Sequence, residues 1–207
     1  TQEVLGTTFI DDCQWDRSAE YKLTAGSILT ADVVNGHYVL SGASGGTWRA
    51  TLPVGNMGSG YYEVELTPQA NGKSYLRFGG YKIIISSGSI SIRNEAEDVV
   101  IVSNNTPTTA DTFYRVGVLW NSPSFTLFIN RVLIGTGNNS ELFAPAVVQI
   151  MGYSATSPVN VKWRNLNIIA LSADSTNGIA ACIPPIGGGA RYGVEESVYN
   201  TFTTENV

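Results

Sequence analysis

Glu63 and Glu65 are the residues best spaced for acid–base chemistry in this sequence. They lie two positions apart in the alternating run Tyr61–Leu66, which predicts a β-strand. Side chains at that spacing share one face of a strand and lie about 7 Å apart. Glycoside hydrolysis uses two carboxylates separated by about 5–9 Å, so a glycoside hydrolase or lyase using this pair is one hypothesis. The competing interpretation is an ion pair between Glu63 and Arg77 on a neighbouring strand.

The second run of this pattern, Ser74–Phe78, follows after the loop Thr67–Lys73, and we expect the two runs to form an antiparallel hairpin. In the register that sorts apolar from polar side chains, Glu63 faces Arg77 and Val64 faces Leu76. The predicted core face then carries Tyr62, Val64, Leu66, Leu76 and Phe78. The other face carries Tyr61, Glu63, Glu65, Tyr75, Arg77 and Tyr81.

That second face is the predicted ligand-binding surface. Tyrosine rings stack on sugar rings, and charged groups bond to sugar hydroxyls. Trp163 and Tyr153 would extend this surface if their strands turn these side chains outward, and the sequence does not fix which way they face. The competing interpretation is that another segment of the chain covers this face.

Other catalytic chemistry finds little support. His37 is the only histidine, and its expected place on a strand suggests an exposed or edge side chain. Asp11, Asp12 and Asp16 form an acidic group of the kind that calcium would want, but a solvated N-terminal loop is the favoured explanation for them. No phosphate-binding loop or dinucleotide fingerprint is present. We therefore predict no catalytic residue, no metal and no cofactor.

The two cysteines, Cys13 and Cys182, lie near opposite ends of the chain. Neither has a neighbouring cysteine or histidine, which argues against a zinc site. They form either one disulfide, as an oxidising compartment would permit, or two separate buried thiols.

The chain has 207 residues, a net charge of −5 and only 14% charged residues. An acidic balance argues against nucleic acid as a partner. No apolar run approaches the roughly 18 residues of a membrane-spanning helix, so no membrane insertion is expected. The length predicts one large domain, alone or with an appendage.

Short alternating runs between Gly, Asn, Ser and Pro clusters predict about ten strands and no long helix, which is the pattern of an all-β sandwich or barrel. One of these runs, Ser124–Asn130, leads into Arg131–Gly135 through a tight turn near Asn130-Arg131. We predict an irregular N-terminal segment (1–30), a β-sandwich (31–172) and an extended C-terminal arm (173–207). The arm is either a frayed tail or a segment that docks on a neighbouring subunit and makes a homo-oligomer.

The order of strands resembles the concanavalin A-like jelly-roll superfamily, which includes lectins and glucanases. Gly60–Leu66 resembles the strand that opens their core. Phe113–Trp120 followed by Phe125–Arg131 resembles a pair of their strands, and Val161–Ile168 resembles the last one. The resemblance implies two packed antiparallel sheets, one of them concave, and often a sugar or peptide ligand. The hydrolases of this superfamily carry a Glu-x-Asp-x-x-Glu strand, whereas Pro68 stands three positions after Glu65, so no catalytic residue is carried over.

We therefore predict a noncatalytic surface module that binds a glycan or a host surface. Its low charge and its richness in Gly, Ser, Thr, Asn and Tyr resemble phage tail-fibre and capsid-decorating domains, which implies a virion fibre or decoration protein. The alternatives are a carbohydrate-binding lectin module of a secreted protein and the hydrolase using Glu63 and Glu65. An extracellular or virion-surface location is expected in the first two cases.

Overall fold

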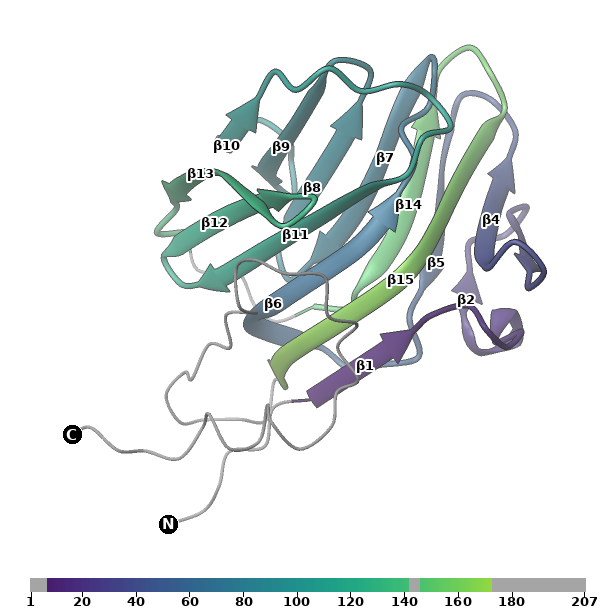
Figure 1. Cartoon of the computed structure of the whole chain (residues 1–207), viewed down its shortest axis with the longest axis horizontal. Helices are drawn as coiled ribbons and strands as arrows, with labels where there is room; N and C mark the ends of the chain where they lie inside the picture. The colour runs from purple at the N-terminus through teal and green to yellow at the C-terminus, as the bar shows by residue number, and fades with distance from the viewer. Residues whose placement is uncertain (1–6, 142–145, 173–207) are drawn as a thin grey trace.

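A computed structural model describes residues 7–141 and 146–172 and shows two antiparallel β-sheets packed face to face (Figure 1). Sheet A has the order β13 (Val132–Asn138), β12 (Ser124–Ile129), β11 (Tyr114–Asn121), β6 (Met57–Leu66), β15 (Val159–Ser172), β4 (His37–Gly42) and β3 (Ile28–Asp32), and β1 (Thr7–Asp11) also pairs with β15. Sheet B has the order β10 (Val100–Asn104), β9 (Ser89–Asn94), β8 (Tyr81–Ser86), β7 (Gly72–Phe78), β14 (Gln149–Ser154), β5 (Gly46–Thr51) and β2 (Lys22–Leu23). This architecture confirms the predicted jelly-roll sandwich.

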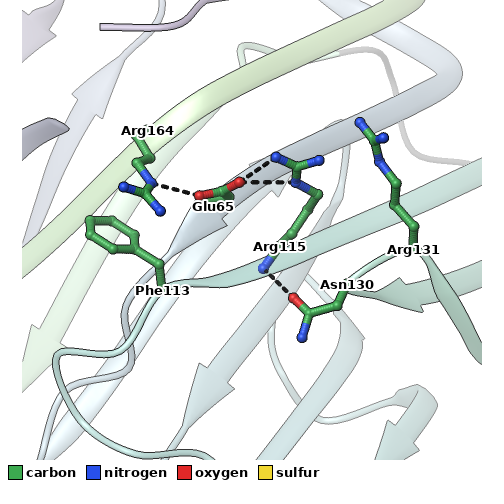
Figure 2. A pocket seen from close by; sticks show the side chains of 6 residues that line it. All are labelled: Glu65, Phe113, Arg115, Asn130, Arg131 and Arg164. Carbon is green, nitrogen blue, oxygen red and sulfur yellow. Dashed lines mark hydrogen bonds and ion pairs between the residues drawn. The ribbon is translucent and has the colours of Figure 1, made fainter. Parts of the chain in front are cut away.

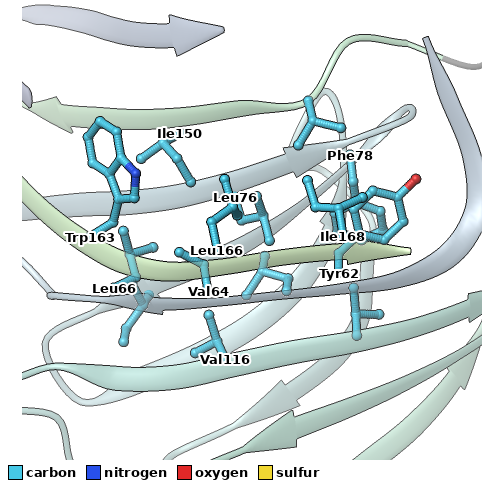
Figure 3. Close-up of a cluster of buried hydrophobic side chains, with 14 of the residues drawn as sticks. Tyr62, Val64, Leu66, Leu76, Phe78, Val116, Ile150, Trp163, Leu166 and Ile168 are labelled. Carbon is cyan, nitrogen blue, oxygen red and sulfur yellow. The ribbon is translucent and has the colours of Figure 1, made fainter. Parts of the chain in front are cut away.

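The core lies between the two sheets and is built by alternation along each strand (Figure 3). The side chains predicted to face inward, which are Tyr62, Val64 and Leu66 of β6 and Leu76 and Phe78 of β7, are all fully buried. β15 contributes Trp163, Leu166 and Ile168 to the same core. Alternation thus predicted correctly which side chains of these strands face inward.

The predicted hairpin between β6 and β7 is wrong. β6 pairs with β11 and β15 in sheet A, whereas β7 pairs with β8 and β14 in sheet B. The connection after Leu66 crosses the edge of the sandwich, where the Thr67 amide donates to the Lys162 carbonyl at 3.0 Å. Two strands that face one core from opposite sheets show the same inward pattern as two neighbours in one sheet, so alternation alone could not distinguish them.

Tyr81 is a second correction, because it faces the core and not the surface. It pairs with Phe78 across the tight β7–β8 turn, and directly paired residues point to the same face of a sheet. Its ring is fully buried and meets Phe125 edge-on, with the ring centroids 4.6 Å apart.

The N-terminal segment is more regular than predicted. It contributes β1 to sheet A and β2 to sheet B, with a 3-10 turn, η1 (Ser18–Glu20), between them. Tyr21 covers one end of the core, where its ring lies 6.0 Å from that of Trp163 and its hydroxyl donates to the buried Asp11 carboxylate at 2.6 Å. The predicted arm (173–207) lies outside the described residues. Within the described part of the chain, no helix is long and apolar enough to cross a membrane.

Candidate functional site

The outer face of sheet A carries a pocket of about 310 Å³ (Figure 2). Four separate segments line it: β6, the start of β11, the β12–β13 turn and β15. The lining residues are Glu65, Phe113, Arg115, Asn130, Arg131 and Arg164. Three guanidinium groups, one carboxylate, one amide and one aromatic ring therefore meet around a single hollow.

Glu65 lies between two arginines, as Figure 2 shows. Arg164 Nε donates to Glu65 Oε2 at 2.6 Å, and Arg115 donates to Oε1 through Nε at 3.0 Å and also through Nη2. Burial raises the pKa of Glu65, but the hydrogen bonds from Arg164 and Arg115 outweigh it and hold the pKa below its usual value. The carboxylate is therefore kept ionised and is fixed in orientation.

This arrangement predicts how the stability of the domain depends on acid. A lowered folded-state pKa adds stability above the unfolded value of about 4.5, and that contribution is lost as pH falls through the folded value. We expect the free energy of unfolding to drop more steeply below about pH 5 in the wild type than in Glu65→Gln, which has no proton to take up at this position. Urea unfolding at stepped pH measures this difference, and parallel curves for the two proteins would contradict it.

A β-bulge in β15 directly follows Arg164. Arg164 pairs with Glu65, but Asn167 rather than Leu166 pairs with Glu63, so one extra residue is inserted between them. Asn165 adopts a positive φ of 50° there, which asparagine tolerates better than most residues. The bulge keeps Arg164 on the outer face while Leu166 still reaches the core.

The β12–β13 turn supplies the opposite side of the pocket. Asn130 and Arg131 have φ values of 50° and 64°, the left-handed pair of a tight hairpin turn, which confirms the turn predicted there. Asn130 Oδ1 accepts a hydrogen bond from the Arg115 amide at 3.1 Å. Arg131 Nη2 lies 3.6 Å from Glu63 Oε1, so the turn reaches over to β6.

Tyr61 and Glu63 continue the row of outer side chains along β6. Tyr61 donates its hydroxyl to Glu63 Oε2 at 2.7 Å, and burial together with the neighbouring Glu63 charge raises the pKa of Tyr61. A Cβ added at Gly117 would lie only 2.8 Å from Tyr61 Oη. The glycine therefore lets the Tyr61 ring lie across β11 toward Phe128, 6.4 Å away between centroids.

The six predicted ligand-binding residues are consequently divided. Tyr61, Glu63 and Glu65 lie together on sheet A, Tyr75 and Arg77 lie on the outer face of sheet B, and Tyr81 lies in the core. The expected Glu63–Arg77 ion pair is wrong, because the whole sandwich separates the two side chains. Arg77 Nε instead donates to Glu95 at 2.8 Å.

On sheet B, Tyr75 packs with Ile84, Met151 and the half-buried Tyr153 in a small apolar cluster separate from the core. Ion pairs attach the loop after β9 to this face, and in one of them Lys73 Nζ lies 2.6 Å from a Glu97 carboxylate oxygen. Tyr75 is only 4% exposed, so its ring has little free surface for a ligand.

The other sequence candidates have local roles. Asp11, Asp12 and Asp16 accept hydrogen bonds from nearby backbone amides in turns, and within residues 7–141 and 146–172 no cluster of three metal-ligating side chains occurs. Cys13 is buried, and burial with the nearby Asp11 charge raises the pKa of its thiol to about 12. Cys182, its predicted disulfide partner, lies outside the described residues.

Five lining residues were not predicted from the sequence: Phe113, Arg115, Asn130, Arg131 and Arg164. One signal for the bulge was present. The inward residues of β15 are spaced by two at Val161 and Trp163, then by three to Leu166, then by two again to Ile168. A single spacing of three inside a period of two is the mark of an inserted residue.

Similar structures establish the fold. Carbohydrate-binding module CBM66 from Bacillus subtilis is 14% identical with a TM-score of 0.58, covering 73% of this chain and 96% of that one. A protein of unknown function with a galectin-like fold from Bacillus subtilis is 10% identical with a TM-score of 0.61, covering 82% and 97%. Bacillus licheniformis β-glucanase is 13% identical with a TM-score of 0.60, covering 81% and 99%.

No protein-family model matches the sequence, and no curated protein matches it either. The structural neighbours include both a binding module and an enzyme, at identities that establish only the fold. The chain therefore has the jelly-roll fold of these proteins, and its activity has to be argued from its own residues.

Proposed function

We propose that this chain is a noncatalytic glycan-binding module whose binding site is the pocket on the outer face of sheet A. The observation that carries the proposal is the position of Glu65 between Arg115 and Arg164. A carboxylate fixed in this way orients the donors around it, and the pocket beside it offers an aromatic ring, an amide and guanidinium groups. These are the group types that fix a sugar ring and its substituents.

The same observation argues against hydrolysis at this pair of glutamates. A glycosidase needs one carboxyl with a raised pKa to protonate the leaving oxygen, whereas the pKa of Glu65 is lowered. Glu63 accepts the Tyr61 hydroxyl, and its side chain is only 6% exposed, which leaves little access for a substrate. The hydrolase hypothesis would be restored if the wild type released reducing ends from a polysaccharide and Glu63→Gln did not.

A role in a virion fibre or decoration protein is the context that we propose for this module. Its support is compositional: 14% charged residues, 22 glycines and ten tyrosines. A lectin module of a secreted protein uses the same site and fold, and both contexts place the chain outside the cell or on the virion surface. Assembly through residues 173–207 belongs to this proposal, and light scattering of full-length and truncated protein tests it.

Binding itself is tested on a glycan array with the wild type, Arg115→Ala and Arg49→Ala. Arg49 is exposed on β5 in the opposite sheet, so its substitution removes the same charge away from the pocket. We expect a glycan that binds the wild type and Arg49→Ala but binds Arg115→Ala roughly 10-fold more weakly, because charge-assisted hydrogen bonds contribute about 1.5–3 kcal/mol each. Equal losses in both variants, or no binding glycan at all, would refute the proposed site.

A further inference from the structure

The pocket on sheet A exposes its positive groups and hides its negative ones. The side chains of Arg115, Arg131 and Arg164 are 27%, 29% and 38% exposed. The carboxylate-bearing side chains beside them, Glu65 and Glu63, are only 11% and 6% exposed. A ligand that enters this pocket therefore meets guanidinium groups first. We infer that the pocket recognises the anionic group of an acidic sugar, an inference that rests on the proposed glycan-binding function.

The arginine beside Phe113 has donors left for such a group. In the described part of the chain, Arg164 donates to a side chain only through Nε, to Glu65. Its planar guanidinium also lies against the Phe113 ring, with Cζ 4.3 Å from the centroid. Arginine presents five N–H groups in a fixed fork that suits carboxylate and sulfate oxygens. The contacts with Glu65 and Phe113 hold that fork in place before a ligand arrives, which reduces the entropy lost on binding.

The charges around the pocket favour the same ligand class. Three arginines face two glutamates here, in a chain whose overall net charge is −5. Long-range attraction therefore does not bring an anion to this protein, and the positive charge acts only near the pocket. Salt screens such partly exposed charges over about 8–10 Å, so binding of an acidic sugar should weaken as salt is raised.

The test uses three trisaccharide probes with the same ring and linkage: galactotriose, trigalacturonate and a sulfated galactotriose. Calorimetry measures their binding to the full chain as wild type, Arg164→Ala and Arg49→Ala. We expect trigalacturonate or the sulfated probe to bind the wild type at least about 10-fold more tightly than galactotriose, with Arg164→Ala losing that preference and Arg49→Ala keeping it. The tighter of the two charged probes identifies the anionic group.

Glu65→Gln is the second variant, because its amide oxygen still accepts a hydrogen bond that orients the arginines, whereas the negative charge that attracts the same guanidinium groups is gone. We expect it to bind the charged probe more tightly than the wild type does, a gain that a purely structural role for Glu65 would not give. Equal binding of neutral and charged trisaccharides would overturn the anionic preference and leave the glycan-binding proposal standing. Failure of every glycan, on the array and in calorimetry, would remove the proposed function and this inference together.

Discussion

Deleting Asn167 is expected to destabilise the domain by at least about 3 kcal/mol, whereas deleting Asn165, two positions earlier, is expected to leave it folded. Trp163, Leu166 and Ile168 all face the core, and the bulge at Asn165 accommodates the odd spacing between the first two. Without Asn165 the three inward residues are spaced by two throughout, and the strand becomes regular. Without Asn167, Leu166 and Ile168 become adjacent in the strand, so they can no longer both face the core.

The loss follows from what must enter or leave the core in the shortened strand. If the bulge persists without Asn167, Ile168 turns to the outer face; if the bulge disappears, Asn165 replaces Leu166 inside. The first outcome also reverses the rest of β15, so Ile169 enters the core and the small, buried Ala170 leaves its close contact with Gly60; the second exposes Leu166 and buries an amide without a built partner. Urea unfolding of both deletions against the wild type measures the difference, and similar losses in the two proteins would show that the bulge does not set the register.

Truncating Trp163 to alanine is expected to cost about 3–5 kcal/mol, as for other large aromatic residues in well-packed cores. Its side chain is fully buried, and its ring lies 5.3 Å from that of Tyr38 on β4 and 6.0 Å from that of Tyr21. The indole therefore packs β15 against its neighbour β4 and against the N-terminal segment. Its removal leaves a cavity at a junction of three segments, which has limited freedom to collapse.

Chemical denaturation of Trp163→Ala and Trp163→Phe tests this role, because phenylalanine retains much of the ring contact. We expect the phenylalanine variant to lose clearly less stability than the alanine variant. A loss below about 1 kcal/mol for Trp163→Ala would mean that the N-terminal segment does not depend on this contact.

The fold class and much of the core could be predicted because alternation is a local property. Val64 and Leu76 were correctly placed inside from their own strands alone. The pairing partner of each strand is a long-range property, and nothing in the spacing of Tyr61–Leu66 says whether the strand facing it lies beside it or across the core. The hairpin with β7 was therefore predicted where β11 and β15 are found. Polar, short strands such as β2 gave no signal at all.

The candidate site could be predicted only in part, for the same reason. Glu65 was selected because it stands on the outer face of an identifiable strand. Arg115 and Arg164 reach it only after β11 and β15 have been placed on its two sides. Arg77, which the wrong hairpin brought close to Glu63, belongs to the far side of the molecule.

The Glu65–Arg164 contact joins positions 99 residues apart in the chain. Arg115, which lies between them in the sequence, binds the same carboxylate. Affinity for the proposed glycan ligand would therefore report complete folding, because no isolated hairpin or proteolytic fragment spanning only one of these strands holds all the groups that line the pocket. A cut in any loop that leaves the strands associated should spare binding. A cut that releases β15 should abolish it in one step.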